Sequence, residues 1–161
     1  MVEARIGSAY FADAGVPSPV PENSFFDLFP LSVLTSSTLD RLRELAPQIR
    51  VDERRFRMNV IVATSGSRFV ENSWVNRQLV IGDVDIDVRQ PDPWCVMTTI
   101  AQGDLPHDTN ILRTLAQHNR IDVGEDGMFP CAGVYAVVAT PGQISARRPS
   151  GTQLTPTSSI N

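Results

Sequence analysis

The hydrophobic pattern of the chain predicts mostly β-strands. The clearest signal is a hairpin over residues 77–89, where apolar and charged residues alternate strictly from Val84 to Arg89, as they do in half-buried strands. Gly82 and Asp83 supply a two-residue turn with glycine first, which tight hairpins favour. Four shorter apolar or β-branched runs predict further strands: Leu31–Thr35, Asn59–Ala63, Cys95–Ile100 and Ala132–Thr140. The second of these is expected to be buried, and the last to be central, because it is apolar on both faces.

Two short amphipathic helices accompany these strands. Leucines at helical spacing predict the first over residues 38–46, with Ser37 as its N-cap and Pro47 just beyond its end. Asp108 is the expected cap of the second helix, which runs to about Asn119. Because strands outnumber helices and the connections are short, the sequence predicts a mainly-β fold, a β-barrel with two short flanking helices.

The chain divides into a lead-in, one folded body and a tail. Residues 1–30 carry several closely spaced prolines and are expected to form an extended linker, because proline fixes φ and removes a backbone donor. Residues 147–161 are rich in Ser, Thr, Pro and Gly, a composition typical of disorder. The body, residues 31–146, is expected to be a single domain.

Composition and charge exclude several classes of function. The net charge of −4 and a pI near 5.1 disfavour nucleic acid and anionic lipid as partners. The sequence shows neither a membrane span nor a secretion signal, so we expect a cytoplasmic protein without a membrane partner. Every basic residue other than histidine is arginine, and without lysine this chain cannot hold pyridoxal phosphate covalently. Two cysteines are too few for a four-thiolate iron–sulfur cluster.

The residue with the clearest chemical potential is Cys95. It follows two prolines in the segment PDPWCVMTT, and proline holds its predecessor in an extended conformation, so the segment is stiff. A thiol there would suit a nucleophile, a sulfur carrier or a soft-metal ligand. The alternative is a small buried hydrophobe, the usual state of a free cysteine. Cys131 is expected to be a second free thiol.

An arginine cluster, RRFRMN, precedes the predicted strand at 59–63. On an extended backbone, Arg57 and Asn59 would lie on one side, where a guanidinium and an amide can bind a phosphate or carboxylate. The alternative, favoured for Arg54 and Arg55, is a solvated loop edge paired with nearby acids. The other ionisable candidates are interpreted as ordinary surface or loop groups: Glu71, Asp83, Asp104, His107 and His118.

Five segments occur in the order and spacing of a known family: PLSVLTSSTLDRL, RRFRMNVIV, FVENSWVNRQLVIGDV, CVMTTIAQGDLP and GVYAVV. Over roughly residues 25–141 the chain resembles the MOSC domain, the C-terminal domain of molybdenum cofactor sulfurases, and specifically that of the amidoxime-reducing molybdoenzymes. The resemblance implies a β-barrel that binds the molybdopterin form of the molybdenum cofactor. Larger relatives carry an N-terminal β-barrel domain, and we expect this chain to lack it.

The same resemblance implies roles for individual residues. Cys95 would be the thiolate that ligates molybdenum or carries sulfur, and so the catalytic residue. The cofactor-binding residues that it implies are Thr35, Ser36, Arg57, Asn59, Thr98, Thr99 and Tyr135. The chain departs from the family at Trp94, where arginine is frequent, and at Met58, where proline is usual. Beyond Pro141 the usual closing strand is replaced by ISARRPSGTQ.

These expectations leave three functions open. The first is a molybdenum-dependent oxidoreductase acting on N-hydroxylated or similar compounds, with electrons from a redox partner protein. In larger relatives the N-terminal domain contributes basic contacts to the cofactor, so the missing domain is a second possible partner. The second is a non-catalytic module that holds the cofactor or carries its sulfur. The third is a degenerate remnant whose fold persists without a working site.

Overall fold

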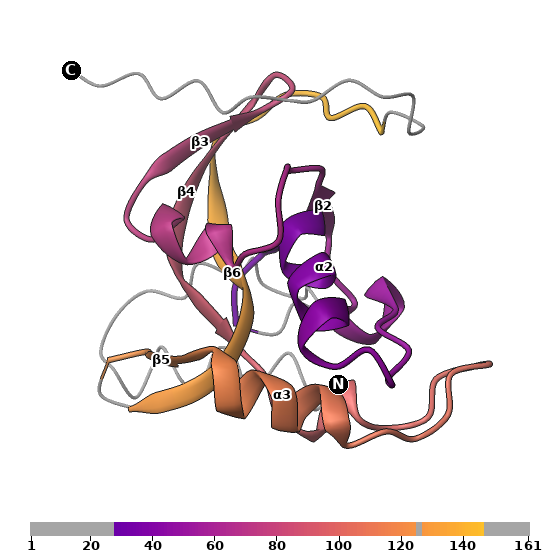
Figure 1. Cartoon of the computed structure of the whole chain (residues 1–161). Coiled ribbons are helices and arrows are strands. Elements are labelled where there is room, and N and C mark those ends of the chain that lie inside the picture. Colours follow the sequence, from indigo (N-terminus) through magenta and orange to yellow (C-terminus); the bar gives the residue numbers. More distant parts are fainter. Residues whose placement is uncertain (1–27, 125–126, 147–161) are drawn as a thin grey trace, which may run out of the picture.

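A computed structural model describes residues 28–124 and 127–146 of the chain. Within them six strands form a sheet that curls into a half-barrel, accompanied by two α-helices (Figure 1). The strands are β1 (Leu31–Thr35), β2 (Val60–Val62), β3 (Gln78–Ile81), β4 (Val84–Pro93), β5 (Arg120–Asp122) and β6 (Met128–Thr140). The helices are α2 (Ser36–Leu45) and α3 (Asn110–His118), with the 3-10 turns η1 (Glu53–Phe56), η2 (Val70–Trp74) and η3 (Val96–Thr98). The mainly-β fold with short helices is therefore confirmed.

Strand β6 holds the sheet together. The strand order is β2-β1-β6-β4-β3, and the first residues of β6 also pair with β5. The central position predicted for this strand is thus confirmed. All pairs are antiparallel except β1 with β2, and α2 and η1 lie in the crossover that a parallel pair requires. Most of the predicted lead-in and the whole predicted tail lie outside the described residues.

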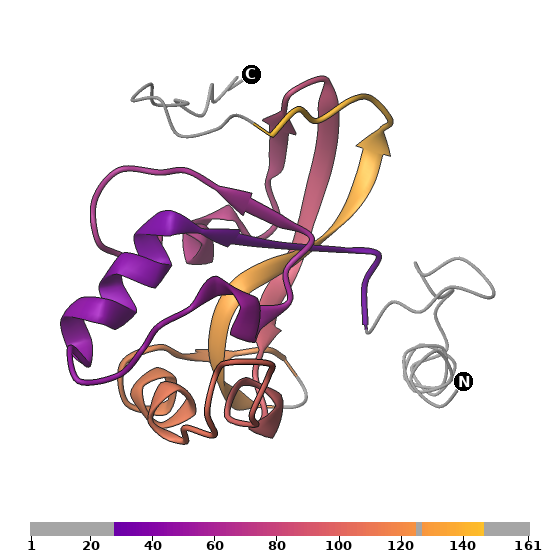
Figure 2. The ribbon, with the colours of Figure 1, turned by 90° about the vertical axis from the view of Figure 1, so that its right-hand side faces the viewer.

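Strand β1 contributes to two hydrophobic cores, because its successive side chains point to opposite faces of the sheet. Leu34 packs with residues of η1 and of both helices, which lie toward the same side of the sheet (Figure 2). Val33 packs with apolar residues of β4 and β6. The buried members of the first core are Leu34, Leu39, Leu42, Ala46, Ile49, Val51, Phe56, Ile111, Leu115 and Ala132. This core supports the segments that carry the candidate site.

The strand predicted at Cys95–Ile100 is wrong. Strand β4 ends at Pro93, and residues 96–98 form η3 instead. The hydroxyls of Thr98 and Thr99 donate to the carbonyls of Cys95 and Val96, three residues earlier, at 3.3 and 2.6 Å. Side-chain bonds of this kind compete with a strand ladder and favour a turn.

The other predicted elements occur with shifted limits. The first strand and the hairpin are confirmed, with Gly82 at φ 64° in the hairpin turn. Strand β2 is shorter than predicted and only partly buried. Helix α2 begins at Ser36, because Thr35 rather than Ser37 is the N-cap and its hydroxyl accepts from the Thr38 amide at 3.1 Å.

Candidate functional site

The Cys95 thiol is exposed at the junction between β4 and η3. The residue before it is anchored firmly: the Trp94 amide donates to the Pro130 carbonyl and its indole Nε1 to the Ala132 carbonyl, both at 2.8 Å. The Trp94 ring also meets Phe56 edge-on, with centroids 5.3 Å apart. The thiol is therefore presented to solvent from a turn of fixed position.

The alternative of a buried, inert cysteine is wrong for Cys95 and describes Cys131 instead. Cys131 is fully buried in β6, and its thiol donates to the Phe129 carbonyl at 3.4 Å. Burial, with a contribution from the nearby Asp92 carboxylate, raises the pKa of the Cys131 thiol to about 12. Both cysteines are free, as the sequence predicted, but only Cys95 is accessible.

The two threonines that follow Cys95 are buried and hold the turn. The Thr98 hydroxyl donates to the Cys95 carbonyl, and the Thr99 hydroxyl to that of Val96. The Thr99 carbonyl in turn accepts from the Asp108 amide at 2.8 Å and closes the loop of residues 99–108. These residues fix the backbone beneath the thiol.

Arg57 does not lie on an extended strand, so the predicted alternation of Arg57 and Asn59 on one side is wrong. Arg57 follows η1 with a left-handed backbone, φ 48°. Its side chain is exposed, and among the described residues it forms no hydrogen bond or ion pair. The Asn59 amide is engaged with β1: its Oδ1 accepts from the backbone nitrogen and hydroxyl of Ser32 at 2.8 and 2.9 Å.

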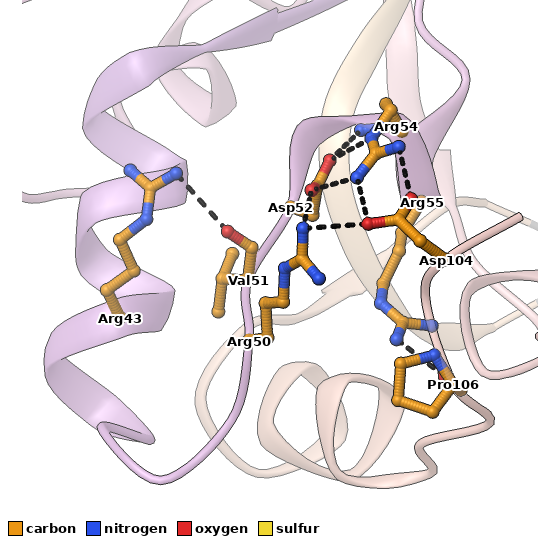
Figure 3. A network of polar contacts seen from close by, with 8 residues as sticks. All are labelled: Arg43, Arg50, Val51, Asp52, Arg54, Arg55, Asp104 and Pro106. Atoms are coloured by element: carbon orange, nitrogen blue, oxygen red, sulfur yellow. Dashed lines mark hydrogen bonds and ion pairs between the residues drawn. The ribbon is translucent and has the colours of Figure 1, made fainter. Parts of the chain in front are cut away.

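The neighbouring arginines 54 and 55 have opposite environments (Figure 3). Arg54 is exposed and pairs with Asp52 and Asp104, each at 2.7 Å, so the interpretation as a solvated loop edge is confirmed for it. For Arg55 that interpretation is wrong. Its side chain is buried, and its guanidinium donates to the carbonyls of Thr98, Ile100 and Pro106 at 3.3, 3.4 and 2.7 Å.

Glu71 is fully buried, so the interpretation as an ordinary surface group is wrong. Its carboxyl group accepts from the hydroxyls of Thr35 and Thr38 and from the Gly133 amide at 2.8, 2.6 and 3.1 Å. Burial raises its pKa, although these hydrogen bonds act in the opposite direction. Ser36, beside Thr35, exchanges hydrogen bonds of 3.0 Å with the backbone of Thr64.

The sequence-predicted site residues fall into three places. The first place is where η1 and η3 are in contact. Arg57 directly follows η1, and Cys95 directly precedes η3, which is followed by Thr99 and ends at Thr98. Thr35 and Ser36 lie at the start of α2 with Glu71. Tyr135 of β6 is paired with Ser32, the partner of Asn59, and its ring stacks on Phe29 with centroids 5.4 Å apart.

The described residues contain no group of three or more His, Cys, Asp or Glu side chains that could hold a metal ion. A metal bound at Cys95 would therefore need most of its ligands from outside the His, Cys, Asp and Glu side chains of the described residues. Among the described helices, none combines the length and the apolar character that a membrane span requires.

A polar surface groove lies on the β3–β4 hairpin. It is lined by Asn76, Arg77, Gln78, Asp87, Val88 and Arg89. None of the predicted site residues belongs to this groove.

Comparison with known protein families gives a match. The family model described as MOSC domain matches residues 21–148, which include every described residue and every predicted site residue. No curated protein matches the chain.

Proposed function

The chain belongs to the MOSC domain family, and we propose that it binds the molybdenum cofactor with the Cys95 thiolate as molybdenum ligand or sulfur carrier. The observation that carries the proposal is the exposed thiol at the start of η3, beside the segment that bears Arg57. A buried thiol could not meet a large ligand, whereas this one is accessible on a fixed turn. The proposed cofactor is molybdenum–molybdopterin.

The residues present suit such a cofactor. A thiolate is a soft donor, and ligation to a highly charged metal favours its deprotonated form. Arg57, exposed and without a partner among the described residues, offers a planar fork of donors that matches a phosphate or a pterin carbonyl. Because the described side chains form no metal cage, the remaining molybdenum ligands would come from the pterin dithiolene.

The other predicted residues divide into exposed residues, which a cofactor could contact, and buried residues, which hold the backbone in place. Asn59 is exposed and Ser36 partly so, and in our proposal they offer further contacts at the other two places, apart from Arg57 and Cys95. Thr35, Thr98, Thr99 and Tyr135 are buried, so they contribute by holding the backbone at which the cofactor rests.

When bound, the cofactor would supply electron-transfer chemistry for the reduction of N-hydroxylated compounds. The chain itself would bind and orient the cofactor and present the thiolate. Electrons would come from a redox partner protein or a further domain, because no flavin or iron–sulfur motif is present in this sequence. A carrier module would use the same residues without turnover.

The test is the molybdenum content of the protein purified from cells that make the cofactor. Wild-type protein is expected to retain molybdenum after gel filtration, and Cys95→Ser to lose it, because a hydroxyl is a poor replacement for a thiolate. Cys131→Ser is the matched control and should retain the metal. Retention with turnover of an N-hydroxylated substrate supports the reductase, and retention without turnover the carrier. Equal molybdenum in wild type and Cys95→Ser would overturn the ligand assignment.

A further inference from the structure

The Arg55 guanidinium is enclosed by the loop that begins at Cys95. Its Nη1 donates to the carbonyls of Thr98 and Ile100, and its Nη2 to that of Pro106 (Figure 3 shows the bond to Pro106). A planar guanidinium can serve several carbonyls at fixed angles, which an ammonium group cannot do in the same way. One side chain thus joins three points of the loop to η1.

If the only role of Arg55 were to stabilise the fold, the burial of its charged side chain would be unfavourable. Arg55 is 1% exposed and forms no ion pair with an acidic side chain of the described residues. Its Nε is also buried, with no hydrogen-bond partner in the part of the chain that the structure describes. A buried charge without a counter-charge is unfavourable, and an apolar side chain of similar length would avoid that penalty. What the guanidinium adds is a defined conformation of the loop.

The held segment is the one that presents the thiol. Thr98 lies three residues after Cys95, and its hydroxyl donates to the Cys95 carbonyl while its own carbonyl accepts from Arg55. A single residue, Thr98, therefore connects Arg55 to Cys95 through hydrogen bonds. On the outside, Arg54 and Arg50 reach the same loop only through the exposed Asp104, and exposed pairs contribute little.

We propose that Arg55 is the positioning residue of the thiol site: its buried guanidinium fixes η3, so that cofactor retention at Cys95 depends on Arg55. This inference rests on the proposed function. Arg55 does not contact solvent. It acts through its hydrogen bonds to the backbone of the loop that begins at Cys95.

The experiment compares four variants with the wild type: Arg55→Met, Arg55→Lys, Arg55→Ala and, as the matched control, Arg54→Gln. Hydrogen exchange by mass spectrometry reports on cofactor-free protein, and molybdenum content reports on protein from cofactor-producing cells. In Arg55→Met we expect amides within residues 96–108 to exchange about tenfold faster or more, because three carbonyls lose a charged donor. Exchange in α2 and β6 should be unchanged.

Molybdenum retention should fall about tenfold in Arg55→Met, less in Arg55→Lys, and not at all in Arg54→Gln. Low concentrations of methylguanidinium should restore both slow exchange and molybdenum retention in Arg55→Ala, because the free cation fits the space left by the side chain. A merely structural role in overall stability predicts faster exchange throughout the domain, and a rescue that is spread over the domain in the same way.

The outcomes separate the two proposals. Unchanged exchange over residues 96–108 in Arg55→Met, or faster exchange spread over the whole domain, overturns the positioning role whether or not molybdenum is bound. Full molybdenum in Arg55→Met beside its loss in Cys95→Ser also overturns that role. If wild-type protein retains no molybdenum, the proposed function fails, and the exchange measurement and its rescue still decide whether Arg55 positions the Cys95 segment.

Discussion

The carboxyl group of Glu71 accepts a 2.6 Å hydrogen bond from the hydroxyl of Thr38, and both side chains are fully buried. No basic side chain among the described residues forms an ion pair with Glu71. The contacts to Thr38, Thr35 and Gly133 join η2 to the start of α2 and to β6. Loss of water around the carboxyl group outweighs these bonds and raises its pKa.

Glu71→Gln should reduce the pH dependence of stability. Because the pKa of Glu71 is raised in the folded state, its contribution is fully present below the unfolded pKa and is lost as the pH rises through the folded pKa. The loss amounts to about 1.4 kcal/mol for each pH unit by which the pKa is raised. Glutamine has a similar shape and stays neutral, so the free energy of unfolding should change less with pH.

Urea unfolding at about pH 5 and about pH 8 measures this difference. Glu53→Gln, at an exposed position, is the control and should follow the wild type. If Glu71→Gln and the wild type lose the same free energy between the two pH values, the carboxyl group does not titrate in the predicted direction.

The two thiols should react at very different rates with a thiol reagent such as Ellman's. Cys95 is exposed, whereas Cys131 is buried and its pKa is about 12, so little of it is the reactive thiolate near neutral pH. The reagent should react with one thiol in native protein and with two in denatured protein. Cys95→Ser should titrate none before unfolding, and a fast reaction of that variant would contradict the buried position of Cys131.

Gly133→Ala should destabilise the domain more than Gly103→Ala. Both glycines have a positive φ, 85° and 56°, so both substitutions introduce backbone strain. A Cβ on Gly133 would also collide with the Met58 side chain and approach the Val33 carbonyl to 2.7 Å, whereas Gly103 has nothing within 4 Å. We expect a cost of about 1 kcal/mol at Gly103 and about 3 kcal/mol or more at Gly133, measured by urea unfolding. If the two substitutions lowered the free energy of unfolding equally, the close packing around Gly133 would not explain its cost.

Trp94→Phe should cost about 1 kcal/mol, because phenylalanine keeps the ring contact with Phe56 but leaves the Ala132 carbonyl without its donor. Trp74→Phe is the matched control, since the Trp74 indole makes no hydrogen bond among the described residues. Thermal unfolding of the two variants measures the difference. A smaller loss for Trp94→Phe than for Trp74→Phe would show that the Nε1 bond contributes little.

The sequence predicts those features whose causes are local. The alternation after Val84 and the glycine at 82 are enough for the hairpin, and the leucine spacing is enough for α2. The strand predicted after Pro93 failed because two threonine hydroxyls turn back onto the chain. An apolar, β-branched run does not distinguish a strand from such a turn.

The contrast between Arg54 and Arg55 could not be predicted from the sequence. The two residues are identical neighbours, and the loop that buries one of them lies more than forty residues later. Glu71 is similar, since its donors come from the start of α2 and from β6. The burial of a polar residue is decided by distant segments, and no local pattern records it.

The central place of β6 has a consequence for how the protein acquires its shape during synthesis. Strands β1 and β2 form one pair and β3 and β4 another, and nothing in the sheet joins these pairs until β6 lies between β1 and β4. A ribosome must therefore release residues 128–140 before the sheet can be assembled. Until then the growing chain exposes unpaired strand edges, the kind of surface that chaperones shield.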